Sequence, residues 1–490
     1  MLFNSYAFIF VFLPITLILF FSLASLRLTR GSLAVLTLAS LVFYAYWSWV
    51  YLPLLLISIV FNYLMGKRIS KADRGSKLSQ ILLLVGIGVN LALLGYYKYA
   101  GFFISSINHF SHSNSPIPDI ILPLGISFYT FTQTAYLVDT YRSEIQDSNY
   151  DLLTYSLFVT FFPHLIAGPI LHHKDMIPQF QRLRNFVFSH ENLMRGLTLF
   201  VLGLSKKLLI ADNLSPWVAP IFDHSSHTTF SEAWVGTLSY AFQLYFDFSG
   251  YCDMAIGLGW MLNINLPANF NSPYKAISIS DFWLRWHITL SNFLRDYLYI
   301  PLGANRLGEV RQYLNLMITM LLAGLWHGAN WTFVVFGGLH GAYLCVDQWW
   351  RKQEISLPKW LAWSVTFVAL LFSLVFFRAH TVGDAIALLQ VMIGFKGIVL
   401  PFNPQGYFSV LTHFGVQLQE WSFFAYLPPP EEQSIGKLIG LLLVVTLLPN
   451  TLQIMEWVQP TWRWATVVGI LSGFCFLSLN HVAEFLYFQF

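Results

Sequence analysis

Charged residues are scarce in this chain of 490 residues: Asp, Glu, Lys and Arg together make up 10% of it. They account for about a quarter of a typical soluble domain. Hydrophobic residues make up 56%, and the net charge of +3 is not concentrated in a long basic tract. The composition therefore excludes a soluble globular protein and a nucleic-acid-binding protein. It predicts an all-α integral membrane protein with the lipid bilayer as its surroundings.

Cysteine is rare as well. Cys252, Cys345 and Cys475 stand apart in apolar segments without CxxC or zinc spacing, so we expect neither a disulfide nor a structural metal. The sequence also lacks GxSxG, HExxH, GxGxxG and Walker motifs, which argues against the enzymes that these motifs mark. The adjacent imidazoles of "HHKD" (172–175) are the one remaining metal candidate, and the sequence shows no partner ligands for them.

Long apolar runs are what the sequence has instead. Stretches of roughly 20 apolar residues can cross a bilayer as helices. The candidates are 6–26, 33–50, 51–65, 79–97, 121–141, 191–212, 233–260, 360–377, 437–453 and 464–480. Together with interrupted segments they predict one multi-pass domain over residues 1–490, with about 10–12 membrane segments.

Basic residues predict the orientation of these segments. Residues 67–77 contain five Lys or Arg, whereas 99–141 contain none. Because short cytoplasmic loops are enriched in Lys and Arg, the first segment is expected inside and the second outside, with both termini outside. Lys206 and Lys207, near the outer end of their helix, fit this scheme only by snorkelling.

Three apolar regions are interrupted, and irregular backbone at membrane depth is tolerated only where protein buries it or where it lines a cavity. Two of them, near 151–171 and 265–303, are predicted to be re-entrant or amphipathic. The third is the pair 312–326 and 330–347, with "HGAN" between its halves. If this pair enters and leaves on the cytoplasmic side, its apex is His327, deep in the membrane.

His327 is the first candidate for chemistry, because ionisable residues within membrane spans are costly and commonly functional. The alternative is a histidine that only hydrogen-bonds a neighbouring helix. Asn330, three residues on, would share a face with His327 if the segment stays helical, and could orient the imidazole. Trp326 adjoins His327, and the flanking Gly324 and Gly328 let another chain or a thin ligand approach closely.

A second histidine, His287, lies within 279–303. Ser291 follows it at i+4, and Asp281 and Arg285 form a possible i,i+4 ion pair. The alternative for this segment is an interfacial amphipathic helix with its aromatic residues among the headgroups, but such a helix does not need the histidine.

Basic residues outnumber acidic ones around this segment. They are Lys275, Arg285, Arg295, Arg306 and Arg311, against Asp281, Asp296 and Glu309. Such a rim could attract an anionic thioester donor, although it equally fits the ordinary cytoplasmic bias. Lys275, Arg285 and Arg295 are the donor-binding candidates.

Four motifs carry a specific resemblance. They are "DFSGYCDMAIGLG" (247–259), "NFNSPY" (269–274), "FWLRWHITLSNFLRDYLYIPLG" (282–303) and "GLWHGANWTFVVFGGLHG" (324–341). In this order they resemble the membrane-bound O-acyltransferase family, and within it the membrane subunit of bacterial polysaccharide O-acetylation, of the alginate O-acetyltransferase type. The opening "MLFNSYAFIFVFLPI" and the ending "FLYFQF" are similar to that branch too, so the resemblance covers essentially the whole chain.

The resemblance implies a ring of tilted and re-entrant helices around a central tunnel, with a cytoplasmic funnel for the donor. It places the family's invariant histidine at His327 and its second active-site residue, a histidine or an asparagine, at His287. Asp253, in the first motif, is a further supporting candidate. By analogy with teichoic acid D-alanylation, Tyr487 in "FLYFQF" is a candidate acyl relay, and its alternative role is in an interfacial aromatic belt.

The predicted function is O-acyl transfer across a bacterial inner membrane to hydroxyls of an external polysaccharide, with acetyl as the first choice of acyl group. His327 would be the general base, and His287 or a neighbouring donor would stabilise the oxyanion or the leaving thiolate. The donor would be acyl-CoA or an acyl-phosphopantetheinyl carrier protein, with no permanently bound cofactor or metal. An extracytoplasmic acetyltransferase would be the partner.

Two rival functions stay open. Transfer to teichoic acid or to a lipid would use the same tunnel chemistry. A transporter or flippase for acyl or glycan intermediates also has broken helices, but it predicts an internal repeat, and the two halves of the sequence show no convincing resemblance.

Overall fold

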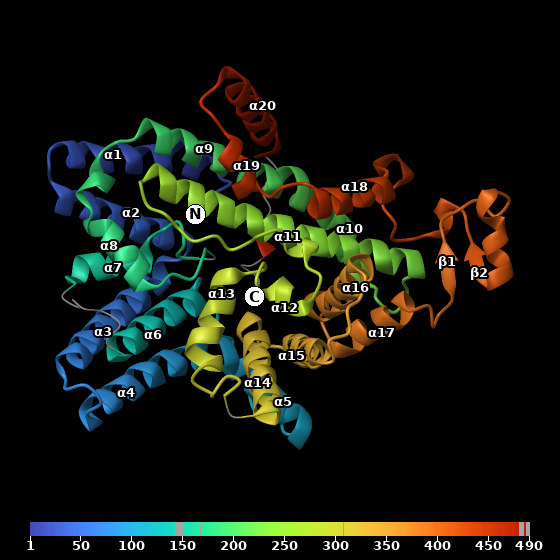
Figure 1. The fold of residues 1–490 in the computed structure, drawn as a ribbon, viewed down its shortest axis with the longest axis horizontal. Helices are drawn as coiled ribbons and strands as arrows, with labels where there is room; N and C mark the ends of the chain where they lie inside the picture. Colours follow the sequence, from blue (N-terminus) through green and yellow to red (C-terminus); the bar gives the residue numbers. More distant parts are fainter. Residues whose placement is uncertain (143–149, 167, 307, 480–484, 487–490) are drawn as a thin grey trace. The chain divides into compact units, whose positions relative to one another are not determined.

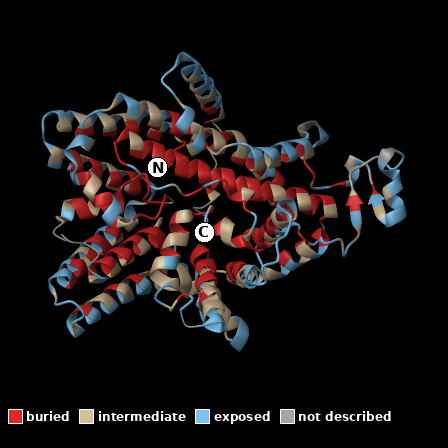
Figure 2. Ribbon diagram, viewed as in Figure 1, coloured by how far each residue is buried: buried red, intermediate tan, exposed pale blue. Residues whose placement is uncertain are grey.

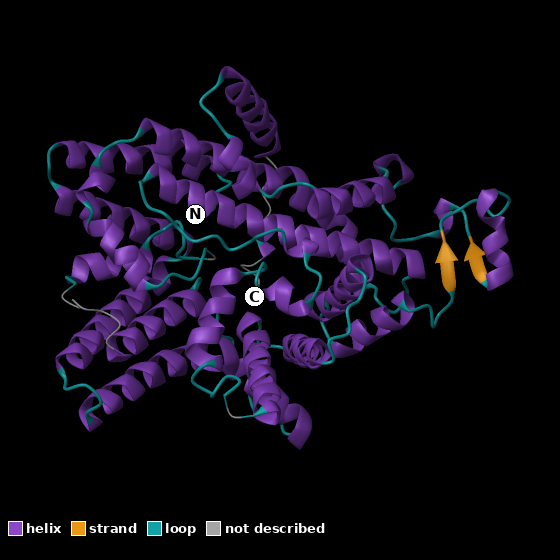
Figure 3. Cartoon of the chain, in the orientation of Figure 1, coloured by secondary structure: helices purple, strands orange, loops and turns teal. Residues whose placement is uncertain are grey.

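The computed structural model describes residues 1–142, 150–166, 168–306, 308–479 and 485–486 (Figure 1). Helices dominate this described part, whose only strands are β1 (Ile398–Leu400) and β2 (Val416–Leu418), paired in parallel (Figure 3). Several helices are long and apolar enough to cross a membrane. The chain is therefore an all-α polytopic membrane protein, as its composition predicts.

The chain divides into two compact units. The first contains residues 1–205, 250–268 and 455–490, and the second contains 206–249 and 269–454. The long helix α11 (Phe230–Met261) contributes residues to both units and is buried along most of its length (Figure 2). That residues 1–490 form one domain stays a prediction.

The first unit contains the N-terminal helices. Its elements are η1 (Ala7–Phe12), α1 (Leu13–Ser25), α2 (Thr29–Trp47), η2 (Trp49–Tyr51), α3 (Leu52–Lys71), α4 (Lys77–Leu94), η3 (Gly95–Tyr99), α5 (Ala100–Ser111), α6 (Ile126–Arg142), α7 (Leu152–Thr160), α8 (His173–Gln181), η4 (Leu183–Phe186), α9 (His190–Ser205), part of α19 (Thr451–Trp457) and α20 (Trp462–Ser478). Side-chain caps start α4 at Ser76 and α7 at Asp151, as polar N-caps commonly do. Buried Asn62 of α3 and Asn90 of α4 exchange amide hydrogen bonds of 3.1 and 2.7 Å, so the two helices satisfy each other's polar groups.

The second unit contains both candidate histidines. Besides the first part of α11 and the two strands, its elements are η5 (Lys206–Ala211), α10 (Asp212–Asp223), η6 (Pro273–Lys275), α12 (Ile279–Trp283), α13 (Ile288–Leu294), η7 (Arg295–Tyr299), α14 (Glu309–His327), α15 (Trp331–Lys352), α16 (Lys359–Arg378), α17 (Val382–Met392), η8 (Tyr407–Phe414), η9 (Trp421–Phe423), η10 (Pro430–Glu432) and α18 (Ser434–Leu447). The predicted interruption of 265–303 is confirmed, because this stretch forms only short helices and turns.

Four described helical segments are long and apolar enough to span a membrane: Ala7–Ser25, Trp49–Lys71, Lys77–Ser111 and Lys359–Arg378. The pair α18 and α19, bent by 62°, qualifies as a broken fifth. These five match predicted spans, although Lys77–Ser111 extends well beyond the predicted end at 97. The other predicted spans form helices that are shorter or less apolar, so a total of 10–12 membrane segments stays a prediction.

Candidate active site

His327 is the last residue of α14, and the predicted break follows it directly. Gly328 has an extended backbone, and α15 begins at Trp331. The two helices lie in close contact at Gly324 and Gly337, where an added Cβ would collide with the carbonyl oxygens of Phe333 and Met320 respectively. Glycine is therefore needed at both positions to bring the helix backbones together, and this contact fixes the end of α14 that carries the histidine.

The imidazole of His327 lies among aromatic rings. Its centroid is 5.1 Å from that of Trp326, 5.2 Å from that of Phe377 and 6.1 Å from that of Phe336. The residue is 5% exposed. An imidazole in such surroundings can exchange a proton with a bound reactant while the rings restrict the entry of water.

His287 lies immediately before α13 in the left-handed region, with φ 44° and ψ 51°, and is completely buried. Non-glycine residues rarely adopt this conformation. Its ring makes a T-shaped contact with Phe248, with 4.9 Å between centroids, and the centroid of the Trp326 ring is 6.2 Å away. The structure thus brings His287, Trp326 and His327 together, from segments that are forty positions apart in the sequence.

Asn269 holds His287 in place, although the sequence analysis did not single it out. Its Oδ1 atom lies 3.2 Å from Nδ1 of His287 and accepts hydrogen bonds from the backbone N–H and the hydroxyl of Thr289, at 3.1 and 3.0 Å. Its backbone carbonyl accepts from the N–H of Ile288 at 3.0 Å. The motif "NFNSPY", which contains Asn269, was the only signal in the sequence.

The helix that would place Asn330 on one face with His327 is not formed, because α14 ends at His327 and the backbone of Asn330 is extended. The side chain of Asn330 caps α15 by accepting from the N–H of Thr332 at 3.1 Å, and its amide donates to the carbonyl of His380 at 3.2 Å. Ser291 lies one turn into α13, where its N–H donates to the carbonyl of His287 at 3.0 Å.

His340 of α15 is a buried histidine that the sequence analysis missed. The indole N–H of Trp283 in α12 donates to its Nδ1 at 3.2 Å, and its Nε2 lies 3.0 Å from the hydroxyl of Ser373 in α16. Both nitrogens are therefore satisfied by protein. His340 links three helices around the site and is best explained as a structural residue.

Lys275, Arg285 and Arg295, the candidates for binding the thioester donor, each contact a carbonyl or carboxylate oxygen of the protein. Nζ of Lys275 donates to the carbonyl of Leu448 at 2.7 Å. The predicted pair of Arg285 with Asp281 is confirmed at 2.7 Å, and Arg295 pairs with its neighbour Asp296 at 2.7 Å. A role of these three cations in binding an anionic donor stays a prediction.

Lys207 is buried between two carboxylates, which explains its place in an apolar helix. Its Nζ atom lies 2.7 Å from Asp247 and 2.8 Å from Asp212. Lys206 donates to the hydroxyl of Thr451 at 3.0 Å. Snorkelling is thus not needed for either lysine.

Asp253 and Tyr487 are the two remaining candidates. Asp253 belongs to the part of α11 in the first unit, and its supporting role stays a prediction. Tyr487 lies outside the described residues.

The "HHKD" histidines have a partner that the sequence did not reveal. Asp139 of α6 lies 3.5 Å from Nδ1 of His173 and 3.9 Å from Nδ1 of His172. Among the described residues, no group of three or more His, Cys, Asp or Glu is arranged to hold a metal ion.

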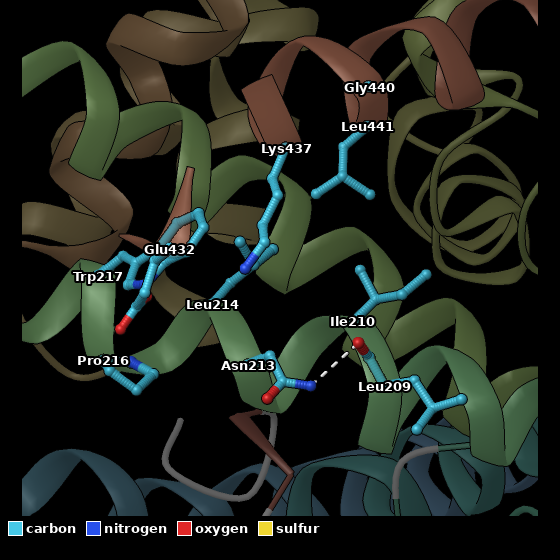
Figure 4. Close-up of a pocket in the computed structure, with 10 residues that line it drawn as sticks. All are labelled: Leu209, Ile210, Asn213, Leu214, Pro216, Trp217, Glu432, Lys437, Gly440 and Leu441. Carbon is cyan, nitrogen blue, oxygen red and sulfur yellow. Dashed lines mark hydrogen bonds between the residues drawn. The ribbon is translucent and has the colours of Figure 1, made fainter. Parts of the chain in front are cut away.

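A pocket of about 650 Å³ lies between α10 and α18 (Figure 4). The indole N–H of Trp217 donates to Glu432 at its wall, and Nζ of Lys437 lies 5.5 Å from the centroid of the Trp217 ring. Its lining residues are Leu209, Ile210, Asn213, Leu214, Pro216, Trp217, Glu432, Lys437, Gly440 and Leu441. Neither histidine belongs to this lining, so the pocket is separate from the candidate active site.

The sequence is similar to known proteins along its whole length. Residues 41–380 match the model of the membrane-bound O-acyltransferase family. The chain is 41% identical to the peptidoglycan O-acetyltransferase of Helicobacter pylori, over 100% of this chain and 98% of that protein. It is 42% identical to a probable alginate O-acetylase of Azotobacter vinelandii, over 81% of this chain and 78% of the relative. A teichoic acid D-alanyltransferase of Streptococcus thermophilus is 28% identical over 48% of this chain and 59% of its own.

Proposed function

Since the chain belongs to the membrane-bound O-acyltransferase family and is an O-acyltransferase, we propose that it passes acetyl groups from a cytoplasmic thioester to hydroxyls of a polysaccharide outside the bacterial inner membrane. The observation that carries this proposal is the meeting of two family motifs at one place, where His287 and His327 both lie against Trp326. The named activities of the similar proteins support the reaction class.

In the proposed reaction His327 is the general base. Its neutral imidazole takes the proton of the incoming hydroxyl while the oxygen attacks the thioester carbonyl. As the tetrahedral intermediate collapses, the C–S bond breaks and the leaving thiolate takes the proton from the imidazolium. A well-placed general base commonly contributes 10²–10⁴-fold to such a rate, and the aromatic rings around His327 would limit competing attack by water.

The donor and partners are also proposals. Acyl-CoA or an acyl-phosphopantetheinyl carrier protein would supply the thioester from the cytoplasm, with Lys275, Arg285 and Arg295 on the donor's path. Their positive charges suit a phosphate-bearing donor. An extracytoplasmic acetyltransferase would complete delivery to the polysaccharide.

Peptidoglycan is the first acceptor to test, because the peptidoglycan O-acetyltransferase matches over nearly the whole of both chains. An alginate-like exopolysaccharide is the second, supported by relatives that match over 81% of this chain. A teichoic acid is supported only by matches of lower identity and coverage.

The acceptor and the role of His327 can be tested together in cells. A deletion strain would carry the wild type or His327→Ala at matched membrane levels, and the acetate released by mild base would be measured separately from peptidoglycan and from extracellular polysaccharide. We expect the wild type to restore ester-linked acetate in one fraction and His327→Ala to restore none. Equal acetate from both strains would contradict the assignment of His327, and acetate in neither fraction of the wild type would contradict the acceptor class.

A relay through Tyr487 makes a separate prediction. Tyr487→Phe removes only the hydroxyl and keeps the aromatic ring, so a covalent acyl relay predicts loss of acetate transfer in the same strains. Unchanged acetate in Tyr487→Phe would rule out the relay and would favour the aromatic-belt role. The wild-type chain, recovered from membranes and analysed by mass spectrometry, should carry an acetyl group on Tyr487 if the relay operates.

A further inference from the structure

The hydrogen bonds around His287 determine which of its nitrogens carries the proton. We propose that Asn269 is a positioning residue that holds the neutral ring of His287 as the Nδ1–H tautomer, so that Nε2 accepts a hydrogen bond from the substrate hydroxyl. This inference rests on the proposed function and adds to it the role of the second histidine.

The identity of the Asn269 atom follows from its neighbours. The backbone N–H of Thr289 can only donate, and it points at this atom from 3.1 Å, so the atom must be the amide oxygen. An amide oxygen only accepts hydrogen bonds. Nδ1 of His287, 3.2 Å from the same oxygen, must therefore donate. In a neutral imidazole the other nitrogen, Nε2, then carries the lone pair.

The arrangement is rigid as well as directional. The backbone of Asn269 accepts from the N–H of Ile288 at 3.0 Å, and the N–H of Asn271 donates to the carbonyl of Arg285 at 2.9 Å. These bonds hold the turn in which His287 adopts its left-handed conformation, and such conformations persist only where the surroundings enforce them. Asn269 and His287 are both buried, so bulk water does not compete for the bond.

This tautomer changes the role expected of His287. A neutral Nε2 without a proton cannot donate to an oxyanion, so oxyanion stabilisation would require a ring protonated on both nitrogens. Acceptance of a hydrogen bond from the substrate hydroxyl needs only the neutral ring. His287 would thereby orient the hydroxyl whose proton passes to His327.

His340 shows the opposite arrangement in the same unit. There the Trp283 indole donates to Nδ1, so the proton lies on Nε2 and is donated to Ser373. Its two nitrogens are both used within the protein, as a structural role requires. The contrast shows that the local partners set a different tautomer at each histidine.

The test compares Asn269→Leu, Asn269→Asp and Thr289→Val with the wild type. It uses inverted membrane vesicles that enclose a soluble glycan acceptor in their lumen and receive labelled acetyl-CoA from the medium. Leucine removes the acceptor oxygen, and the lost orientation should lower kcat/KM on the order of 10–100-fold. Aspartate keeps an acceptor oxygen and should restore most of the rate. Thr289→Val, which removes only the second donor to the same oxygen, should have a rate within about threefold of the wild type.

The pH profile separates positioning from a merely structural role. A carboxylate at position 269 favours the protonated ring, so the acidic limb of the kcat/KM profile should move to higher pH in Asn269→Asp. The double variant of Asn269→Leu and His287→Gln should lose no more activity than His287→Gln alone, because Asn269 acts only through His287.

Several outcomes would overturn the inference: an unshifted profile in Asn269→Asp, no rescue by aspartate, or losses that multiply in the double variant. If Asn269→Leu does not fold, the pH profile of kcat/KM for Asn269→Asp still tests whether Asn269 positions His287. Failure of the proposed function itself would look different, since His327→Ala would then transfer acetyl as the wild type does, whatever stands at position 269.

Discussion

Lys207 is an ammonium group in an apolar environment, and its two carboxylate partners make that placement tolerable. Removal of one member of a buried ion pair leaves uncompensated charge and typically costs about 3–5 kcal/mol. We therefore predict that Lys207→Met lowers the free energy of unfolding by about that amount, measured by thermal or denaturant unfolding in a fixed detergent.

A matched control for Lys207 is the exposed pair of Arg30 and Asp151, 3.3 Å apart. Arg30→Gln should cost about 0–1 kcal/mol, because water solvates such pairs in either state. Equal losses in Lys207→Met and Arg30→Gln would show that the buried triad contributes no special stability.

Single residues also show what a sequence can and cannot predict. His327 was identifiable because a histidine in an apolar hairpin is locally conspicuous, and His287 because it lies in a recognisable motif. Their partners were not, since Asn269 is 18 residues from His287, Asp247 is 40 from Lys207, and Trp283 is 57 from His340. Such pairings depend on how distant segments pack, which local periodicity does not encode.

Among the elements, the hairpin of α14 and α15 carries His327, the proposed general base, and the close packing of the two helices leads to a prediction. A methyl group on Gly324 would collide with the backbone of α15, so Gly324→Ala should push the helices apart and cost about 1–3 kcal/mol. Because His327 ends α14, acetyl transfer should fall as well. Both effects can be measured on the same preparation, by unfolding and by transfer from labelled acetyl-CoA.

Gly338 provides the control for this hairpin. A Cβ there would make only an ordinary contact with Leu321, at 3.5 Å. Gly338→Ala should keep both stability and activity, with a small gain from helix propensity. If Gly338→Ala impaired transfer as much as Gly324→Ala, close packing at Gly324 would not be the reason for the loss.

The elements themselves were predictable to different degrees. The apolar runs and the "HGAN" segment located the break between α14 and α15 to within one residue, whereas the outer ends of the two helices lie three and five residues beyond the predicted ones. The role of Asn330 was not foreseen, because an asparagine two residues after a glycine can either continue a helix face or cap the next helix, and the choice depends on where the chain turns. The four short elements within 265–303 could be predicted only as an interruption.

At the scale of the whole molecule, the distribution of basic residues predicts which loops face the cytoplasm. The segment Lys77–Ser111 is one of the potential spans, so the exposed residues Asp73 and Asn114 should lie on opposite sides of the membrane. In a background without native cysteines, Asn114→Cys should react with an impermeant thiol reagent in spheroplasts. Asp73→Cys should react only after lysis, and the reverse pattern would invert the predicted orientation.

The role proposed for His327 can be tested most directly by measuring thioester-dependent transfer by this chain with and without its imidazole. Inverted membrane vesicles from a deletion strain, carrying equal amounts of the wild type or of His327→Ala and enclosing the polysaccharide acceptor in their lumen, would receive labelled acetyl-CoA at the exposed cytoplasmic face. The assignment of His327 as general base predicts labelled polysaccharide with the wild type and a rate about 10²–10⁴-fold lower with His327→Ala. Equal labelling by the two proteins would contradict it.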